Sequence, residues 1–507
     1  YSENSENRYV ENPTMNSDET LQRNTGYRQV DVLQKFFIPL SNKTDLKLNF
    51  HYSSSSNIPR FDRLSELTDL SDSSSLKFAE WYYGPQKRLL ISPQLDLHPE
   101  KKWMEKGTIT FGYQNIQESR IQRKFGSLNR SYREETVNIF SVNGDFSVPL
   151  TKKRNRNFGY GFELSYNDVN SNSYGKTLSV SGTDIIGFSD TFAIQSRYPD
   201  GGSDYTTAAI YSDYRQDITS NSTLNTGIRF THTQLNATWI DQTFILLPKT
   251  TINLANSAVT ATIGYVFKPD KNWQINSVLS SGFRSPNVDD VGRVREKNGE
   301  VTVPNINLRP EFAYNAEIGL QKYFNNKRFR IDGNVYYTLL DNYIQRDTFE
   351  LDGAQKVLFD GELGHVVANQ NRGNAYIMGY TINYQGKIAN HWKTSGFITY
   401  TKGATYDTNE SMSSIPPLFG QFELLYNANR FEIGVQYQFN SKKNIDSFNI
   451  SEGIDNHDLT PIVDLNSTEL KDMYFGTPSW AIVGLFGSYD LHSNWKLQGR
   501  IDNMFDL

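Results

Sequence analysis

The chain has no cysteine among its 507 residues. This absence excludes disulfide frameworks, thiolate metal sites and cysteine nucleophiles. It does not identify the compartment, because oxidising compartments permit disulfides without requiring them. The sequence also lacks any apolar run near the ~20 residues that a membrane-spanning helix needs. Its net charge of -5 argues against a nucleic-acid binder, since such proteins normally carry a basic patch or a high pI.

Motifs of targeting and of catalysis are missing as well. The first four residues, Tyr1 to Asn4, are polar and acidic, without the charged n-region and apolar h-region of a signal peptide. We therefore expect an internal piece of a larger precursor. The sequence contains no Walker loop, no H-E-x-x-H and no G-x-S-x-G motif, so it offers no argument for an enzyme.

What the chain does contain is low hydropathy combined with many aromatic side chains. Hydrophobic residues make up 37% and the mean hydropathy is -0.58, yet aromatics reach 13%, with 30 Tyr and 31 Phe. A soluble domain of this length would bury a large aliphatic core or divide into several domains. A membrane barrel instead needs an apolar stripe toward lipid, aromatic girdles at both interfaces and a polar interior. The composition favours a barrel.

Alternation of apolar and polar residues supports this interpretation. In 430–440 one face carries Phe431, Ile433, Val435, Tyr437 and Phe439, while polar residues and glycine occupy the other. Successive side chains of a strand point to opposite faces, so one face can meet lipid and the other water. The same pattern recurs at 158–167, 329–339 and 495–503. A soluble propeller would show a signature repeat of about 40–50 residues, and none is present.

Short and long connections alternate along the chain, as they do in outer-membrane barrels, whose periplasmic turns are short and extracellular loops long. This pattern predicts an all-β, antiparallel transmembrane barrel with about 18 strands, whose bounds are uncertain by a few residues. The predicted strands are 28–40, 44–54, 86–97, 107–118, 135–149, 156–168, 205–218, 222–233, 257–268, 271–284, 311–324, 328–344, 374–389, 391–402, 418–428, 430–440, 480–490 and 494–505. The predicted long loops are 54–85, 119–134, 169–204, 234–256, 285–310, 345–373, 403–417 and 441–479.

Five short segments then occur in an order that is characteristic of one family. They read S-G-F-R-S-P-N-V-D-D at 281–290, P-N-I-N-L-R-P-E at 304–311, N-A-Y-I-M-G-Y at 374–380, I-P-P-L-F-G at 415–420 and D-N-M-F-D at 502–506. Together they resemble motifs of the TonB-dependent receptors, most closely the haem/haemoglobin/transferrin-type subgroup of Bacteroidetes. By this resemblance the structural motif residues are Phe283, Arg284, Pro286, Asn305, Leu308, Pro310, Glu311, Pro416, Pro417, Asn503 and Phe505.

The resemblance implies a fold and a function. Residues 1–507 would form part of a 22-strand barrel, without its N-terminal plug, first strands and last strand. The family imports scarce nutrients across the bacterial outer membrane with energy from TonB, most often iron complexes. Transported haem or a ferric siderophore is therefore expected, with no resident cofactor. Another large nutrient (a peptide or a glycan) and a passive or structural barrel remain alternatives. Expected partners are outer-membrane lipid, the TonB complex acting through the plug, and a surface lipoprotein, but no nucleic acid.

Candidate ligand residues lie in the predicted outer loops. His365 and His457 could ligate haem or a metal, or could be solvated loop residues, and the sequence names no definite metal site. Haem receptors of this subgroup often place a His between the first two motifs, and 287–303 contains none; Tyr and Met can also ligate haem iron. Arg284 and Arg293 could attract an anionic ligand or could pair with lumen carboxylates. The loops 345–373 and 441–479 are predicted to contribute to ligand capture.

Overall fold

β-Strands make up most of the chain in the computed structural model. The described residues are 8–14, 16–18, 20–68, 75–297, 299–359, 361–449, 461–464, 466–467 and 473–505. Within them the helices are short: α1 (Phe61–Leu64), α2 (Val288–Gly292) and the single 3₁₀ turn η1 (Ile445–Ser447). None of the helices in this part of the chain is long and apolar enough to cross a membrane.

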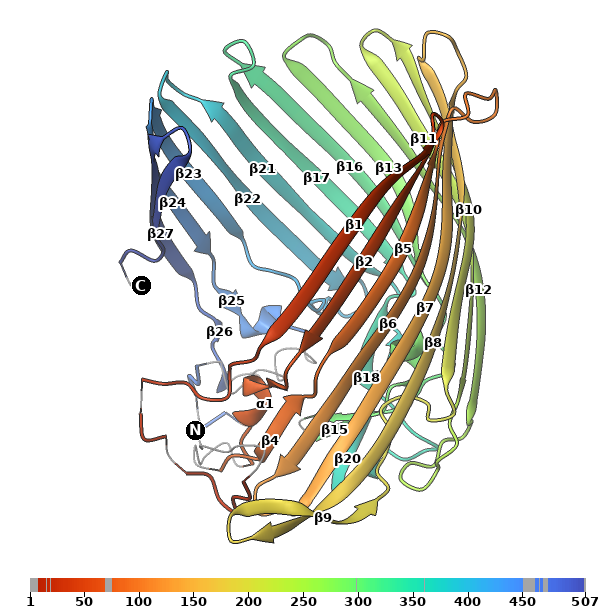
Figure 1. The fold of residues 1–507 in the computed structure, drawn as a ribbon, viewed down its shortest axis with the longest axis vertical. Helices are drawn as coiled ribbons and strands as arrows, with labels where there is room; N and C mark the ends of the chain where they lie inside the picture. Colours follow the sequence, from red (N-terminus) through yellow and green to blue (C-terminus); the bar gives the residue numbers. More distant parts are fainter. Residues whose placement is uncertain are drawn as a thin grey trace.

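One large antiparallel sheet forms the wall of the molecule (Figure 1). Its long strands follow each other in chain order, each hydrogen-bonded to the next. They are β1 (Gln29–Ser41), β2 (Thr44–Ser55), β5 (Lys87–Leu97), β6 (Lys106–Lys124), β7 (Asn129–Pro149), β8 (Arg156–Ser181), β10 (Ser203–Thr219), β11 (Ser222–Thr238), β12 (Thr251–Phe267), β13 (Trp273–Arg284), β16 (Glu311–Phe324), β17 (Phe329–Asp341), β21 (Ala375–Lys387), β22 (Trp392–Thr405), β23 (Phe419–Ala428), β24 (Phe431–Asn440), β27 (Trp480–His492) and β28 (Trp495–Ile501). Each predicted strand coincides with one of them.

The wall does not close on itself. Among the described residues β1 pairs with β2 alone and β28 with β27 alone. Figure 1 shows the two ends of the curved wall, near β1 and β27, standing apart. Three shorter strands extend the same sheet: β4 (Phe78–Tyr83) pairs with β6, β3 (Ile58–Pro59) pairs with β4, and β9 (Asp184–Phe192) pairs with β8. The total of 22 strands for a closed barrel stays a prediction.

Apolar side chains line the outer surface of the wall. On β17 the exposed residues are Ile331, Val335 and Tyr337, and Val335 keeps 64% of its surface accessible. On β24 the exposed row is Phe431, Ile433, Val435 and Tyr437, as the alternation predicted. Rows of this kind would be unfavourable in water, because removing apolar surface from water lowers the free energy by about 25 cal/mol per Å². The hydrocarbon of a bilayer is the solvent that suits them.

Polar side chains occupy the opposite face and satisfy one another. Asn334 on β17 donates a hydrogen bond to Glu317 on β16 (3.1 Å), and Asn383 on β21 donates to Asp332 on β17 (3.1 Å). Charged residues at membrane depth normally face such an interior and find partners there. The wall is therefore apolar outside and polar inside, the reverse of a soluble protein.

A glycine lets aromatic rings pack across a strand of the wall. Tyr384 on β21 and Phe422 on β23 stack with ring centroids 6.1 Å apart, although β22 lies between their strands. Gly396 is the β22 residue paired with both. A Cβ there would come within 2.7 Å of Phe422 Cδ1 and 2.8 Å of Tyr384 Cε1. The rings meet because that position has no side chain.

Several predicted long loops are wrong, because they contain regular strands. The 119–134 segment is a hairpin in which β6 and β7 continue to a turn near 125–128, and much of 169–204 is the extension of β8 and its hairpin with β9. Once a strand leaves the hydrocarbon, both of its faces meet water, so the apolar half of the alternation disappears while the backbone pairing continues. The sequence pattern ends before the strands do.

Two other predicted loops fold into a separate small sheet. Segment 285–310 holds α2, β14 (Arg295–Lys297) and β15 (Glu300–Thr302), and 345–373 lies mostly in β18 (Ile344–Thr348), β19 (Lys356–Phe359) and β20 (Glu362–Asn371). β20 pairs in parallel with β15 and antiparallel with β18 and β19. A short pair, β25 (Lys443–Asn444) and β26 (Gly476–Thr477), lies within the predicted loop 441–479.

The buried apolar core sits with this small sheet. We call α2, β14, β15, β18, β19 and β20 together with residues 239–250 the loop assembly. Its core contains Trp239, Ile245, Leu247, Val294, Val301, Val303, Leu351, Phe359, Val366 and Ala368. A second cluster joins α2 to the ends of β11 and β12 through Leu235, Ala237, Ile252, Val288, Val291, Leu308 and Ile344. The loop assembly thus lies at the end of the wall where the long connections gather, which we call the long-loop end.

Candidate functional site

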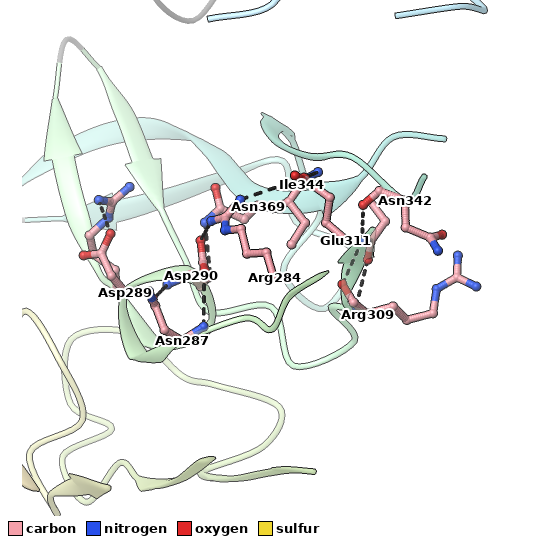
Figure 2. Close-up of polar contacts among 11 residues, drawn as sticks. Arg284, Asn287, Asp289, Asp290, Arg309, Glu311, Asn342, Ile344 and Asn369 are labelled. Carbon is pink, nitrogen blue, oxygen red and sulfur yellow. Dashed lines mark hydrogen bonds and ion pairs between the residues drawn. The ribbon is translucent and has the colours of Figure 1, made fainter. Parts of the chain in front are cut away.

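The segment that follows β13 is locked into a capped turn. Asn287 accepts a hydrogen bond from the Asp290 backbone N–H (3.0 Å), and the Asp290 carboxylate accepts one from the Asn287 N–H (3.1 Å). Such a capping box satisfies two backbone donors at a helix start. Arg284, the last residue of β13, forms an ion pair with Asp290 (2.6 Å) and approaches Glu311 (3.9 Å) (Figure 2). The first sequence motif therefore ties α2 to the wall.

Polar contacts from the second motif continue this network (Figure 2). The Glu311 carboxylate accepts the backbone N–H of Ile344 (2.8 Å). Asn371 donates to the carbonyls of Arg309 (3.0 Å) and Asn342 (2.8 Å). Asn305, which is buried, donates to the Asn369 carbonyl (2.7 Å), and Asn369 donates to that of Asp290 (3.1 Å). These side chains satisfy backbone groups of the loop assembly, which a buried connection would otherwise leave unpaired.

Arg293 pairs with the other carboxylate of α2. Its guanidinium lies 2.8 Å from Asp289, and the Tyr198 hydroxyl donates to the same carboxylate (2.6 Å). Burial, with the adjacent Asp289 charge, raises the pKa of Tyr198, so this phenol remains a hydrogen-bond donor at neutral pH. Arg284 and Arg293 thus both have carboxylate partners within the chain. That they brace the wall through lumen carboxylates stays a prediction. Their role in attracting an anionic ligand stays a prediction.

The two candidate histidines are not brought together by the described residues. His365 lies exposed on β20, level with Glu300 of β15 and Lys356 of β19. His457 lies outside the described residues. Over the described ranges no group of three or more His, Asp or Glu side chains could hold a metal ion. A ligand role for either histidine stays a prediction.

The remaining motif residues occupy structural positions. The rings of Phe283 and Phe312 lie 5.5 Å apart where β13 pairs with β16. Pro286 and Leu308 are buried. Pro310 immediately precedes β16, and Pro416 and Pro417 precede β23. Asn503 has a positive φ of 48° in the turn after β28, and Phe505 is exposed there. These residues mark the ends of strands.

A second site at the long-loop end was not predicted. It is a cavity of about 160 Å³ between the wall strands β4, β6 and β7, the segment around α1, and the loop assembly, with the aromatic rings of Trp81 and Tyr83 in its lining. We call it the arginine pocket, because its lining includes Arg60, Arg63, Arg120, Arg133, Arg197 and Arg295. Lys77 beside it connects β4 to the loop assembly through Glu296 (4.0 Å) and Glu362 (3.6 Å). Its six arginines come from five segments of the chain, so no single short sequence pattern marks the whole pocket.

An antiparallel wall with apolar residues outside, polar residues inside and a folded loop assembly at one end defines an outer-membrane β-barrel receptor fold. The chain belongs to the TonB-dependent receptor-like β-barrel family, whose family model matches residues 19–504. This family consists of bacterial outer-membrane transport receptors rather than enzymes. The protein is accordingly located in the outer membrane.

Solved structures show the same fold at low sequence identity. The chain is similar to the copper transporter OprC (TM-score 0.71, 13% identity, 95% of this chain and 66% of OprC covered). It is also similar to the ferric citrate transporter FecA in its unliganded form (TM-score 0.69, 13% identity, 96% of this chain and 66% of FecA covered). A third similar structure is a double mutant of the Serratia marcescens hemophore receptor HasR in complex with its hemophore HasA and heme. Its TM-score is 0.65 at 14% identity, with 94% of this chain and 68% of that chain covered. The chain spans about two thirds of the length of each. No curated protein matches it.

Proposed function

We propose that this protein is the barrel of a receptor that imports an iron complex, haem or a ferric siderophore, across the outer membrane with energy from TonB. In the proposal the present strands belong to a 22-strand barrel, and an N-terminal plug couples to TonB. Outer-membrane lipid covers the exposed apolar rows. The Bacteroidetes haem/haemoglobin/transferrin-type subgroup and a surface lipoprotein partner are parts of the same proposal.

The observation that carries the proposal is the family match over 19–504. The folded loop assembly supports it, because recognition residues usually lie on loops that a rigid scaffold positions. The names of two structurally similar proteins, a hemophore receptor in complex with heme and a ferric citrate transporter, support an iron complex as the cargo. His365, His457, Arg284 and Arg293, with the loops 345–373 and 441–479, remain the proposed contributors to capture.

A haem titration tests the proposal. The receptor produced from its complete gene, in detergent, is titrated with haem while the Soret band is followed, with a ferric siderophore as competitor. Saturable binding that weakens in His365→Ala or His457→Ala would identify a haem receptor and assign these loops a role. Haem binding unchanged in both variants would remove the two histidines from the proposal.

The control variant is His492→Ala. This exposed histidine ends β27, at the end of the wall opposite the long loops. It should bind like the parent protein. Siderophore binding without haem binding would identify the siderophore as cargo. A receptor that binds neither, and whose deletion leaves growth on both iron sources unchanged, would contradict the import of iron complexes.

A further inference from the structure

Six guanidinium groups converge on the arginine pocket from distant parts of the chain. Arg60 caps the start of α1 and Arg63 lies within it, Arg120 and Arg133 lie on β6 and β7, and the remaining two are Arg197 and Arg295. Glu296 is the one carboxylate in the lining. Like charges gathered in this way repel each other, so the arrangement needs compensating anions or aromatic faces nearby.

Carboxylates behind the pocket supply part of this compensation. Asp62 pairs with Arg60 (2.5 Å), Glu66 pairs with Arg63, and Glu118 and Glu135 both pair with Arg120, the latter at 2.6 Å. Burial raises the pKa of Glu66, while Arg63 and Lys77 oppose the rise. These carboxylates pair with Arg60, Arg63 and Arg120 and partly offset their charge.

Aromatic rings orient the same arginines. The guanidinium of Arg60 lies 5.2 Å from the ring centroid of Trp81 and 5.0 Å from that of Tyr83. Arg63 lies 5.8 Å from Trp81, and Arg120 lies 5.4 Å from Tyr83. A guanidinium stacked on a ring keeps its N–H donors at its edge, the geometry that recognises carboxylates in pairs of hydrogen bonds. Arg60 uses this edge for Asp62 and for the Tyr83 hydroxyl.

Arg197 retains unused donor capacity. It stacks on Tyr198 (5.3 Å), and its buried Nε has no hydrogen-bond partner within the described part of the chain. A buried donor without a partner costs about 1–3 kcal/mol, more for a charged group. An anionic group in the pocket would recover that free energy. Arg133 lies beside it, with its Nε donating to the Gln195 carbonyl (3.2 Å).

We propose that the arginine pocket binds a carboxylate-bearing group of the transported ligand. The cavity of about 160 Å³ is below the ~300 Å³ of pockets that enclose whole small molecules. It therefore takes a citrate-sized group and not an entire haem or siderophore. The ligand group would contact the wall and the loop assembly together. This inference rests on the proposed function for the identity of the cargo, but the pocket itself can be tested without iron.

The test is an isothermal titration of the complete receptor in detergent with metal-free citrate. Arg133→Gln and Arg197→Gln should each weaken binding about 10-fold or more, the range expected for a charged hydrogen-bonding group. Arg133→Lys should recover part of the affinity, since an ammonium keeps the charge without the paired donors. Trimethyl citrate, which is uncharged, should not bind.

The matched control is Arg154→Gln, an exposed arginine in the turn between β7 and β8, paired with Glu105 (2.5 Å). It should bind citrate with the affinity of the parent protein. Equal thermal unfolding temperatures of all variants would show that a loss of binding does not come from misfolding. Absence of citrate binding, equal affinity in Arg133→Gln and Arg197→Gln, or preference for inorganic phosphate would overturn the assignment. A receptor that takes up iron complexes but binds no citrate contradicts the pocket alone. One that binds citrate here but imports no iron contradicts the proposed function alone.

Discussion

The wall and the loop assembly place the same kinds of residue in opposite environments. On the wall, Ile318 and Val335 point outward and are largely exposed, while Glu317 and Asn334 face the interior. In the loop assembly, Val301 and Val366 are 0% and 2% exposed within a shared core. The difference follows from the solvent. Hydrocarbon surrounds the outer face of the wall and solvates its apolar side chains. Water surrounds the long-loop end, where apolar side chains are stable only when they are buried in a core. Exposed apolar residues therefore mean something different in the two regions.

The largest expected effect comes from breaking the core of the loop assembly. Trp239 is 2% exposed in this core, so Trp239→Ala should destabilise the loop assembly by about 3–5 kcal/mol. Hydrogen exchange should show protection lost in β15 and β20 but retained in wall strands such as β17. Equal loss of protection in both regions would mean that the wall and the loop assembly unfold as one unit.

A charge on the lipid face should cost somewhat less. Val335→Arg places a guanidinium near the middle of β17 on the outer face. This change should destabilise the barrel by about 2–4 kcal/mol. The neighbouring Asn334→Arg, on the interior face near Glu317, is the matched control and should cost under about 1 kcal/mol. Folding free energies from denaturant titration in lipid vesicles compare the two. Similar costs would show that the outer face does not meet hydrocarbon.

Filling the gap at Gly396 tests packing within the wall. Gly396→Val adds a side chain where the Tyr384 and Phe422 rings approach, and overpacking of this kind costs about 1–3 kcal/mol. Gly499→Val on β28 has nothing within 4 Å of its added Cβ and should be near neutral. The measurement is again denaturant unfolding in vesicles. A near-neutral Gly396→Val would show that the two rings can separate without cost.

The smallest expected effect concerns the cap that joins the two regions. Asn287→Ala removes the side-chain acceptor of α2 and should cost about 1 kcal/mol. Asn287→Ser keeps a side-chain acceptor and should retain most of the stability that Asn287→Ala loses. Hydrogen exchange of the Asp290 and Val291 amides reports the local opening. If alanine and serine behave alike, the ion pair of Arg284 with Asp290, and not the cap, holds α2 in place.

Much of the wall could be predicted from the sequence because its signal is local. Alternation within ten residues identifies a strand such as β24, and a short polar turn identifies its antiparallel neighbour. The ends of β6, β7 and β8 at the long-loop end could not be predicted, because polar residues on both faces remove the alternation while the hydrogen bonds continue.

The candidate site was predictable only in part. The motif at 281–290 contains Arg284, Asn287 and the two carboxylates of α2, Asp289 and Asp290. The remote partners of α2, Tyr198 and Asn369, carry no pattern that connects them to it. The same holds for Ile344, whose backbone N–H binds Glu311. The arginine pocket was missed for the same reason, since Arg60 and Arg295 meet only after the loop assembly folds against the wall.

The sequence by itself determined the class of this protein, its strands and its lipid-facing rows, because these depend on the order of residues over short spans and on the solvent that each face requires. The tertiary structure decided which loops fold into a core, that Glu311 approaches Arg284, and where six arginines converge. Those contacts join segments tens to hundreds of positions apart. They are selected by the packing of the whole molecule, which no local pattern records.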